Sequence, residues 1–157
     1  MTVRFIADLI GEAGVFDGLA AEDLDLVAGC AKNVQFPAGG LLLQEGEHAD
    51  TFYLIRTGRV GLEVHVPDGG ALIIDTLGPG DVVGWSWLFP PYRWSYDARA
   101  LEDTRTVAFD GACLRGKCDD DPRLGYALMQ RFSRVMVSRL QATRLQLLDL
   151  YGRHRGT

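Results

Sequence analysis

The sequence predicts an antiparallel β-sandwich or β-barrel that is flanked by helices and followed by one long C-terminal helix. Between Val34 and Phe109, short runs of β-branched and aromatic residues alternate with glycine-rich turns. These turns recur roughly every 8–12 residues, which is typical of an all-β domain. After Pro122, hydrophobic residues continue at helical spacing as far as Gly152. The fold class is therefore mainly β with flanking helices.

The size and composition are those of one globular domain. The chain has 157 residues, of which 47% are hydrophobic and 24% are charged. No apolar run approaches the roughly 20 residues that a membrane-spanning helix needs. The N-terminal stretch contains acidic residues and lacks the order of regions found in a signal peptide. We therefore expect a cytoplasmic protein that does not associate with membranes.

The flanking elements follow from local patterns. Residues 3–13 and 20–31 are rich in helix formers and are predicted to be helical. Residues 60–66 alternate, which predicts one buried and one solvated strand face. The buried set is Val60, Leu62, Val64 and Val66, and the solvated set is Gly61, Glu63 and His65.

The chain returns to helical patterns after Asp110. The residues DGACLRGK predict a short helix, and Asp121 followed by Pro122 is a typical helix start. We expect a single domain over 1–157. Its parts are N-terminal helices at 1–31, β-strands at 32–109, and the short and long helices at 110–151.

The long helix carries two apolar stripes. One has the spacing of a two-stranded coiled-coil seam, and it comprises Met129, Ser133, Met136, Leu140, Thr143, Leu147 and Leu150. The neighbouring stripe of Leu128, Phe132 and Val135 is suited to cover the β-domain. In the alternative interpretation, all apolar residues of the helix pack on the β-domain. A length of roughly 45 Å exceeds what one small barrel covers, so we favour a homodimer through this helix.

Three segments together resemble a known family. They are FPAGGLLLQEGEHADTFYLIRTGRVGLEV at 36–64, IDTLGPGDVVGW at 74–85, and the long helix with its Arg-Leu-Gln triplet. This pattern is similar to the cyclic-nucleotide-binding domain of catabolite-activator-type bacterial regulators. The resemblance implies a β-roll, or jelly roll (double-stranded β-helix), with a dimerising C-terminal helix. It also implies a regulatory protein with no enzymatic activity and no cofactor, whose ligand would be a cyclic nucleotide such as cAMP or cGMP.

The resemblance places the ligand site in residues 84–100, where this chain departs from the family pattern. Gly84 and Ser95 match the pattern, but Trp85 stands in place of the glutamate that holds a ribose hydroxyl. Trp94 stands in place of the arginine that binds the phosphate, and Arg93 comes one residue early. Tryptophan has one hydrogen-bond donor and no acceptor, so it replaces neither group.

Two functions follow from this departure. In the first, the chain is a sensor that binds a small ligand in the β-roll and signals through the dimer helix. The residues predicted to bind that ligand are Gly84, Trp85, Ser86, Trp87, Arg93, Trp94, Ser95, Arg139 and Thr143. In the second, the tryptophans close the pocket, and the chain is a dimeric adaptor for a partner protein. Its exposed FPPYRW loop at 89–94 would suit protein contact. Trp94 separates the two hypotheses, because it lies either inside or outside the pocket.

Other chemistry is disfavoured. The formal net charge of −5 argues against a nucleic-acid-binding face, and the tail YGRHRGT leaves no room for a helix-turn-helix. We expect no direct DNA binding by this chain. The sequence GWSWL lacks the second glycine of a hydrolase nucleophile elbow.

Metal and disulfide chemistry are disfavoured as well. The histidines His48, His65 and His154 lack metal-ligand spacing and are expected in solvent, as are the acids Glu45, Glu47 and Asp50. The cysteines Cys30, Cys113 and Cys118 form no even set, which favours free thiols over a disulfide framework. A metal or redox pair of Cys113 with Cys118 lacks a second cluster of ligands.

Overall fold

The computed structural model describes residues 2–11 and 14–155. The helices are α1 (Thr2–Gly11), η1 (Gly14–Phe16), α2 (Ala21–Ala28), η2 (Ser86–Leu88), α3 (Gly111–Asp120) and α4 (Pro122–Arg155). The strands are β1 (Ala31–Phe36), β2 (Leu41–Leu43), β3 (Thr51–Thr57), β4 (Val60–Val66), β5 (Gly70–Leu77), β6 (Val82–Val83), β7 (Asp97–Ala100) and β8 (Thr104–Asp110).

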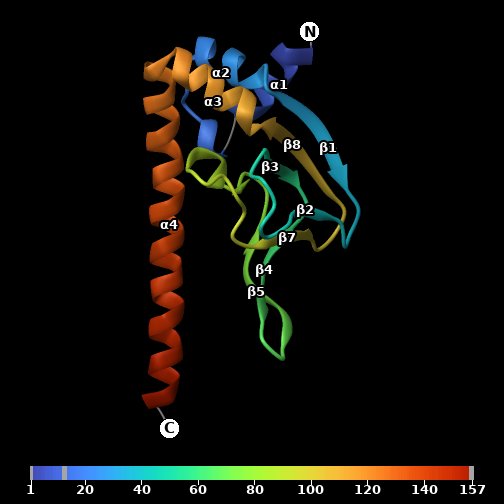
Figure 1. Ribbon diagram of the computed structural model, residues 1–157, viewed down its shortest axis with the longest axis vertical. Coiled ribbons are helices and arrows are strands. Elements are labelled where there is room, and N and C mark those ends of the chain that lie inside the picture. The colour runs from blue at the N-terminus through green and yellow to red at the C-terminus, as the bar shows by residue number, and fades with distance from the viewer. Residues whose placement is uncertain (1, 12–13, 156–157) are drawn as a thin grey trace.

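The strands of the described residues form two antiparallel sheets, with the orders β1-β8-β3-β6 and β2-β7-β4-β5. Inward-facing residues such as Leu62 and Ala98 pair across neighbouring strands and are buried between the sheets. Helices α1, α2 and α3 gather at one end of this β-roll, and α4 runs down one side of it (Figure 1). The predicted antiparallel jelly roll with a long C-terminal helix is confirmed.

Strand β4 does not follow the simple alternation that the sequence predicts. Val60 and Leu62 are buried as expected, but Glu63 is only 6% exposed and Val66 is 37% exposed. A register shift against β5 lies between Leu62 and Glu63, and the pairing of β4 with β7 ends at Glu63. Beyond that point only β5 accompanies the strand, so Val66 has no second sheet to pack on.

The helix boundaries differ from the prediction, most clearly at the ends of α2 and α4, whereas residues 12–13 of the predicted first helix lie outside the described residues. Helix α2 ends at Ala28, and Ala31 already pairs with Phe109 in the sheet. Helix α4 begins at Pro122 as predicted, but it continues through Gly152 to Arg155. A single glycine costs a helix about 1 kcal/mol relative to alanine, which weakens the last turns without ending them.

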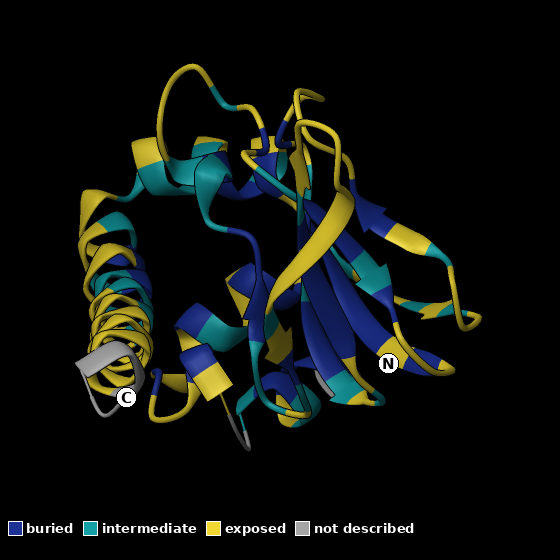
Figure 2. Ribbon diagram, turned by 90° about the horizontal axis from the view of Figure 1, so that it is seen from below, coloured by how far each residue is buried: buried dark blue, intermediate teal, exposed yellow. Residues whose placement is uncertain are grey.

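The two halves of α4 have different surroundings. Leu124, Leu128 and Phe132 are fully buried against the β-roll and η1. From Leu140 to Gly152 every residue is exposed, and Figure 2 shows this change along the helix. At 1.5 Å per residue, a helix of 34 residues is about 51 Å long and extends past the roll. Among the described residues, no helix combines the length and apolar character that crossing a bilayer requires.

The expectation of three free thiols is wrong, because Cys30 and Cys113 form a disulfide. The pairing of Ala31 with Phe109 brings the segments that carry the two cysteines together. Their Cα atoms are 5.9 Å apart, which is the usual separation for a disulfide. The predicted candidate pair of Cys113 with Cys118 is not formed. Cys118 remains a half-buried thiol, and burial raises its pKa.

Candidate functional site

The segment 84–96 connects β6 to β7 and contains all three tryptophans of the chain. It is held against the loop 44–49 by backbone hydrogen bonds. The Gly46 amide donates to the Trp94 carbonyl at 2.9 Å, and the Trp94 amide donates to the Glu47 carbonyl at 3.0 Å. The Ala49 amide donates to the Tyr92 carbonyl at 2.7 Å. The loop and the segment therefore form a paired edge over this part of the roll.

Trp87 lies in the hydrophobic core. Its side chain is fully buried and stacks on Phe52, with ring centroids 4.6 Å apart. Phe132 of α4 meets it edge-on at 5.3 Å. Its indole Nε1 has no hydrogen-bond partner among the described residues, so this ring is buried for its apolar surface.

Trp94 fills the space next to Gly84. Its side chain is 5% exposed and belongs to the same core. A Cβ atom at Gly84 would lie 2.5 Å from ring atom Cζ3 of Trp94 and 3.3 Å from Leu43. Gly84 also has a φ of +97°, a conformation that favours glycine. Trp94 thus lies inside the roll, in contact with the glycine that opens the segment.

The predicted ligand-binding residues of this segment are divided between core and surface. Arg93 is exposed, and its guanidinium Nη1 donates to the Gly46 carbonyl at 2.8 Å. Ser95 is exposed, whereas Trp85 and Ser86 are half-buried at the start of η2. The structure therefore brings Gly84, Trp87 and Trp94 together in the interior and leaves Arg93 and Ser95 outside it.

The predicted ligand-binding residues on α4, Arg139 and Thr143, have partners within the chain. Arg139 Nη1 lies 2.5 Å from Asp75 Oδ2 of β5, and its side chain is mostly buried. The Thr143 hydroxyl donates to the Arg139 carbonyl at 2.9 Å, which is a bond within the helix. Next to the ion pair, burial raises the pKa of the Tyr96 phenol to about 12, with Arg139 opposing this shift and Asp75 adding to it. Arg139 therefore links the β4–β5 hairpin to α4.

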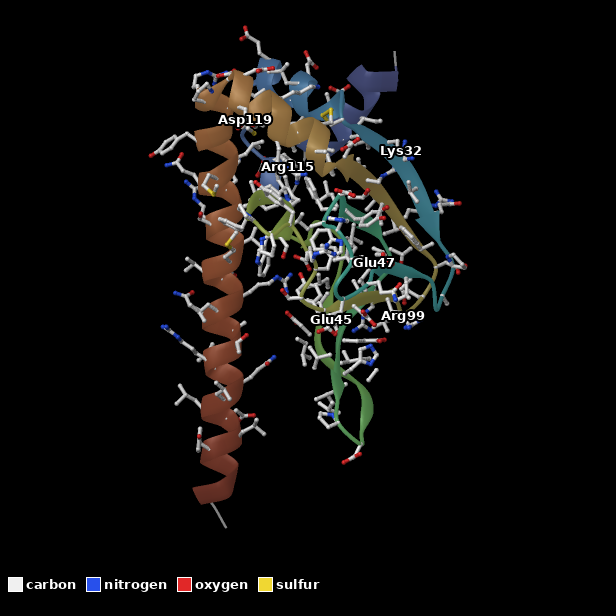
Figure 3. The ribbon with its side chains drawn as sticks, in the orientation of Figure 1. Lys32, Glu45, Glu47, Arg99, Arg115 and Asp119 are labelled. Atoms are coloured by element: carbon white, nitrogen blue, oxygen red, sulfur yellow. A yellow bond between two sulfur atoms is a disulfide. The ribbon has the colours of Figure 1, made fainter. Side chains whose placement is uncertain are left out.

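A polar cluster on the outer face of the β2–β7–β4–β5 sheet was not predicted. The carboxylate of Asp97 is buried, and it accepts the Glu45 amide at 2.7 Å and lies 3.0 Å from His65 Nε2. The Glu45 amide, and then His65 and Arg99, hold the pKa of Asp97 below its usual range against the opposing effect of burial. Arg99 pairs with Glu63 at 3.1 Å, and Figure 3 labels Arg99 and Glu45 in this region.

This cluster changes the sequence interpretation of His65. His65 is exposed, as predicted, but it is paired with Asp97. The acids Glu45, Glu47 and Asp50 are exposed, as predicted. The alternation of Asp97 and Arg99 with Ala98 and Ala100 was the signal for two charged residues on one strand face. No group of three potential metal ligands gathers in the described part of the chain, and the side chain of His154 lies outside it.

Comparison with known proteins identifies relatives of this arrangement. Residues 33–121 match the family described as cyclic nucleotide-binding domain. The CRP-like cAMP-activated global transcriptional regulator of Mycobacterium tuberculosis is 29% identical over 143 residues, which cover 91% of this chain and 62% of that protein. The chain therefore spans less than two thirds of the length of that relative.

Solved structures show the same fold. The Catabolite Activator Protein of Thermus thermophilus superimposes with a TM-score of 0.68 at 26% identity, covering 85% of this chain and 61% of that one. A cyclic nucleotide-binding domain from Methylobacillus flagellatus gives a TM-score of 0.77 at 20% identity, covering 93% of this chain and 82% of that one. The second likeness concerns the fold alone.

Proposed function

Because the chain belongs to the cyclic nucleotide-binding domain family, we propose that it is a regulatory module whose ligand space is filled by its own tryptophans. In this proposal it holds no cyclic nucleotide and works as a homodimeric adaptor joined through α4. It acts in the cytoplasm by contact with a partner protein, and it has no catalytic step of its own.

The position of Trp94 carries this proposal. The side chain is 5% exposed and touches Gly84, so its indole occupies the volume beside the start of the segment. Interiors of proteins are packed with few voids, and a ligand entering here must first displace the ring. Displacing a buried tryptophan forfeits the apolar burial that stabilises the fold, about 3–5 kcal/mol by analogy with truncation to alanine.

The charges around the segment support the same conclusion. An anionic phosphate needs a positive charge or several free N–H donors. Arg93 donates to the Gly46 carbonyl, and the Trp94 amide donates to the Glu47 carbonyl. Arg139 is paired with Asp75 at 2.5 Å. Binding a cyclic nucleotide with these groups would require several internal bonds to break.

The exposed half of α4 supports the homodimer. The seam residues Leu140, Leu147 and Leu150 are each more than half exposed, and they recur with coiled-coil spacing. The neighbouring stripe of Leu128 and Phe132 is already covered by the roll. A second copy of α4 would cover the exposed seam symmetrically.

Calorimetric titration with cyclic AMP and cyclic GMP tests the closed pocket. We expect no binding heat at millimolar nucleotide for the wild-type protein and none for Arg93→Ala. Micromolar binding that Arg93→Ala abolishes would overturn the proposal and establish the ligand-binding sensor instead. A known cyclic-AMP-binding protein titrated with the same nucleotide solutions serves as the positive control.

A further inference from the structure

The disulfide between Cys30 and Cys113 joins the start of a strand to the start of a helix. Cys30 directly precedes β1, which is an edge strand of its sheet. Cys113 lies in the first turn of α3, where its amide donates to the capping carboxylate of Asp110 at 3.0 Å. The two cysteines are 83 residues apart in the sequence. The bond therefore fixes the first turn of α3 to the edge of the β-roll.

The surrounding strands are held together by other bonds as well. Ala31 pairs with Phe109, and the Asp110 amide donates to the Cys30 carbonyl at 2.8 Å. Lys117 Nζ donates to the Leu26 carbonyl at 2.6 Å. None of these hydrogen bonds involves the sulfur atoms, so we expect the β1–β8 ladder to remain when the disulfide opens. What the opening removes is the covalent restraint on α3.

Helix α3 directly contacts the segment 84–96. Arg115, labelled in Figure 3, donates from Nη1 to the Trp87 carbonyl at 2.7 Å, and its guanidinium lies 4.2 Å from the centre of the Tyr92 ring. A Cβ atom at Gly111 would lie 3.0 Å from the Trp87 Cβ, so the helix and the segment are in close contact. Helix α4 follows α3 after a single residue. Greater mobility of α3 would therefore extend to the segment 84–96 and to the start of α4.

The bond can be reached from solvent. Both cysteines line a surface depression of about 390 Å³ together with Lys32, Asp50 and Asp110. Cys113 is half-buried, whereas Cys30 is almost fully buried. Cys113 is thus the more accessible cysteine of the pair, and accessibility is one of the properties that distinguish exchangeable disulfides from enclosed ones.

We propose that Cys30–Cys113 is a reversible thiol–disulfide site, reduced by dithiols, whose state sets how firmly α3 is held against the segment 84–96. One thiolate of the dithiol attacks Sγ of Cys113, and the S–S bond breaks to release the Cys30 thiolate, which takes up a proton. The second thiol of the reductant then displaces the Cys113 thiolate, which is protonated in turn. Two electrons pass to the protein, and the dithiol leaves as its own disulfide.

The experiment compares the oxidised and reduced protein by maleimide labelling and hydrogen exchange. The folded protein is treated with or without dithiothreitol and then labelled in denaturant, and mass spectrometry should find one labelled cysteine, Cys118, without reduction and three after it. Amide exchange in 111–120 and 86–88 should then rise about ten-fold or more, while β8 stays protected. The melting temperature should fall by roughly 5–15 °C.

Two variants separate this site from general effects of reductant. Cys113→Ser should show the fast exchange of α3 without any reductant, and Cys118→Ser should respond to reductant as the wild type does. Three labelled cysteines in air-oxidised protein, or unchanged α3 exchange after full reduction, would overturn the proposal. So would a bond that dithiothreitol reduces only in denaturant. Should Cys113→Ser fail to fold, the wild-type reduction series decides alone. These readouts involve neither nucleotide nor dimer, so they stand apart from the proposed function.

Discussion

The segment 84–96 and the distal half of α4 (residues 140–152) differ in where their large apolar side chains lie. In the segment, Trp87 and Trp94 are buried in the core. In the distal half, Leu140 and Leu147 are exposed along one seam. The difference teaches that apolar character alone does not indicate a binding surface. Apolar side chains that cover one another are already shielded from water. An exposed apolar seam is shielded only when a partner binds to it.

The largest expected effect on stability comes from removing the buried side chain of Trp94. Trp94→Ala should lower the free energy of unfolding by about 3–5 kcal/mol, because it removes a buried indole and leaves a cavity beside Gly84. Urea denaturation measures this loss. Added indole should restore part of it by filling the cavity. Trp85→Ala, at a half-buried position, is the control and should cost less. An effect below about 1 kcal/mol for Trp94→Ala would contradict its place in the core.

A smaller effect on stability is expected from the ionisation of Tyr96, which adjoins the Arg139–Asp75 pair. Burial raises the pKa of Tyr96 to about 12, above the value near 10 of an unfolded chain. The folded state therefore holds this proton more tightly, so stability is complete below about pH 10 and falls as the pH rises toward 12. A shift of this size corresponds to about 2–3 kcal/mol.

Urea midpoints between about pH 9 and pH 12 check this dependence. Tyr96→Phe should show a shallower decline than the wild type over that interval. Tyr53→Phe is the comparison variant. Burial raises the pKa of Tyr53 as well, so this variant should also show a shallower decline in stability. Identical slopes for the wild type and Tyr96→Phe would show that the phenol is not buried beside the ion pair.

The smallest effect on the stability of a single chain is expected in the distal half of α4. A substitution there should nevertheless prevent the proposed dimer from forming. Leu147→Asp should change the unfolding free energy of the single chain by less than about 0.5 kcal/mol, because residue 147 is exposed. It should convert the dimer to a monomer in sedimentation equilibrium.

Leu145→Asp is the matched control for this substitution. Leu145 is 67% exposed against 51% for Leu147, and the heptad spacing places it on the opposite side of the helix from the seam. This variant should remain dimeric. A wild-type chain that sediments as a monomer would contradict the homodimer directly.

The sequence predicted those parts of the fold that depend on local patterns. Glycine-marked turns and alternating strands predicted the β-roll, and Asp121 with Pro122 predicted the start of α4. The family resemblance gave the position of the segment 84–96. Whether Trp94 lies inside or outside the roll could not be predicted, because a loop tryptophan has no periodicity that indicates its direction.

Long-range contacts account for the remaining differences. The pairing of Cys30 with Cys113 depends on the β1–β8 register, which no local pattern specifies. The burial of Asp97 depends on the loop 44–49, which supplies the Glu45 amide from more than 50 residues away. Each of these features follows from the assembled sheets and not from the neighbours of the residue in the chain.

The same disulfide makes the oxidised β-roll a closed covalent ring. All eight strands lie between Cys30 and Cys113, so the ring contains both sheets. Helices α1 and α2 lie in the tail before the ring, and most of α3 and all of α4 lie in the tail after it. A protease that cuts the exposed turn at 67–69 opens the ring without releasing a fragment, and the nicked protein keeps its full mass until a reductant is added. A cut in α4 shortens a tail and releases its fragment in either redox state.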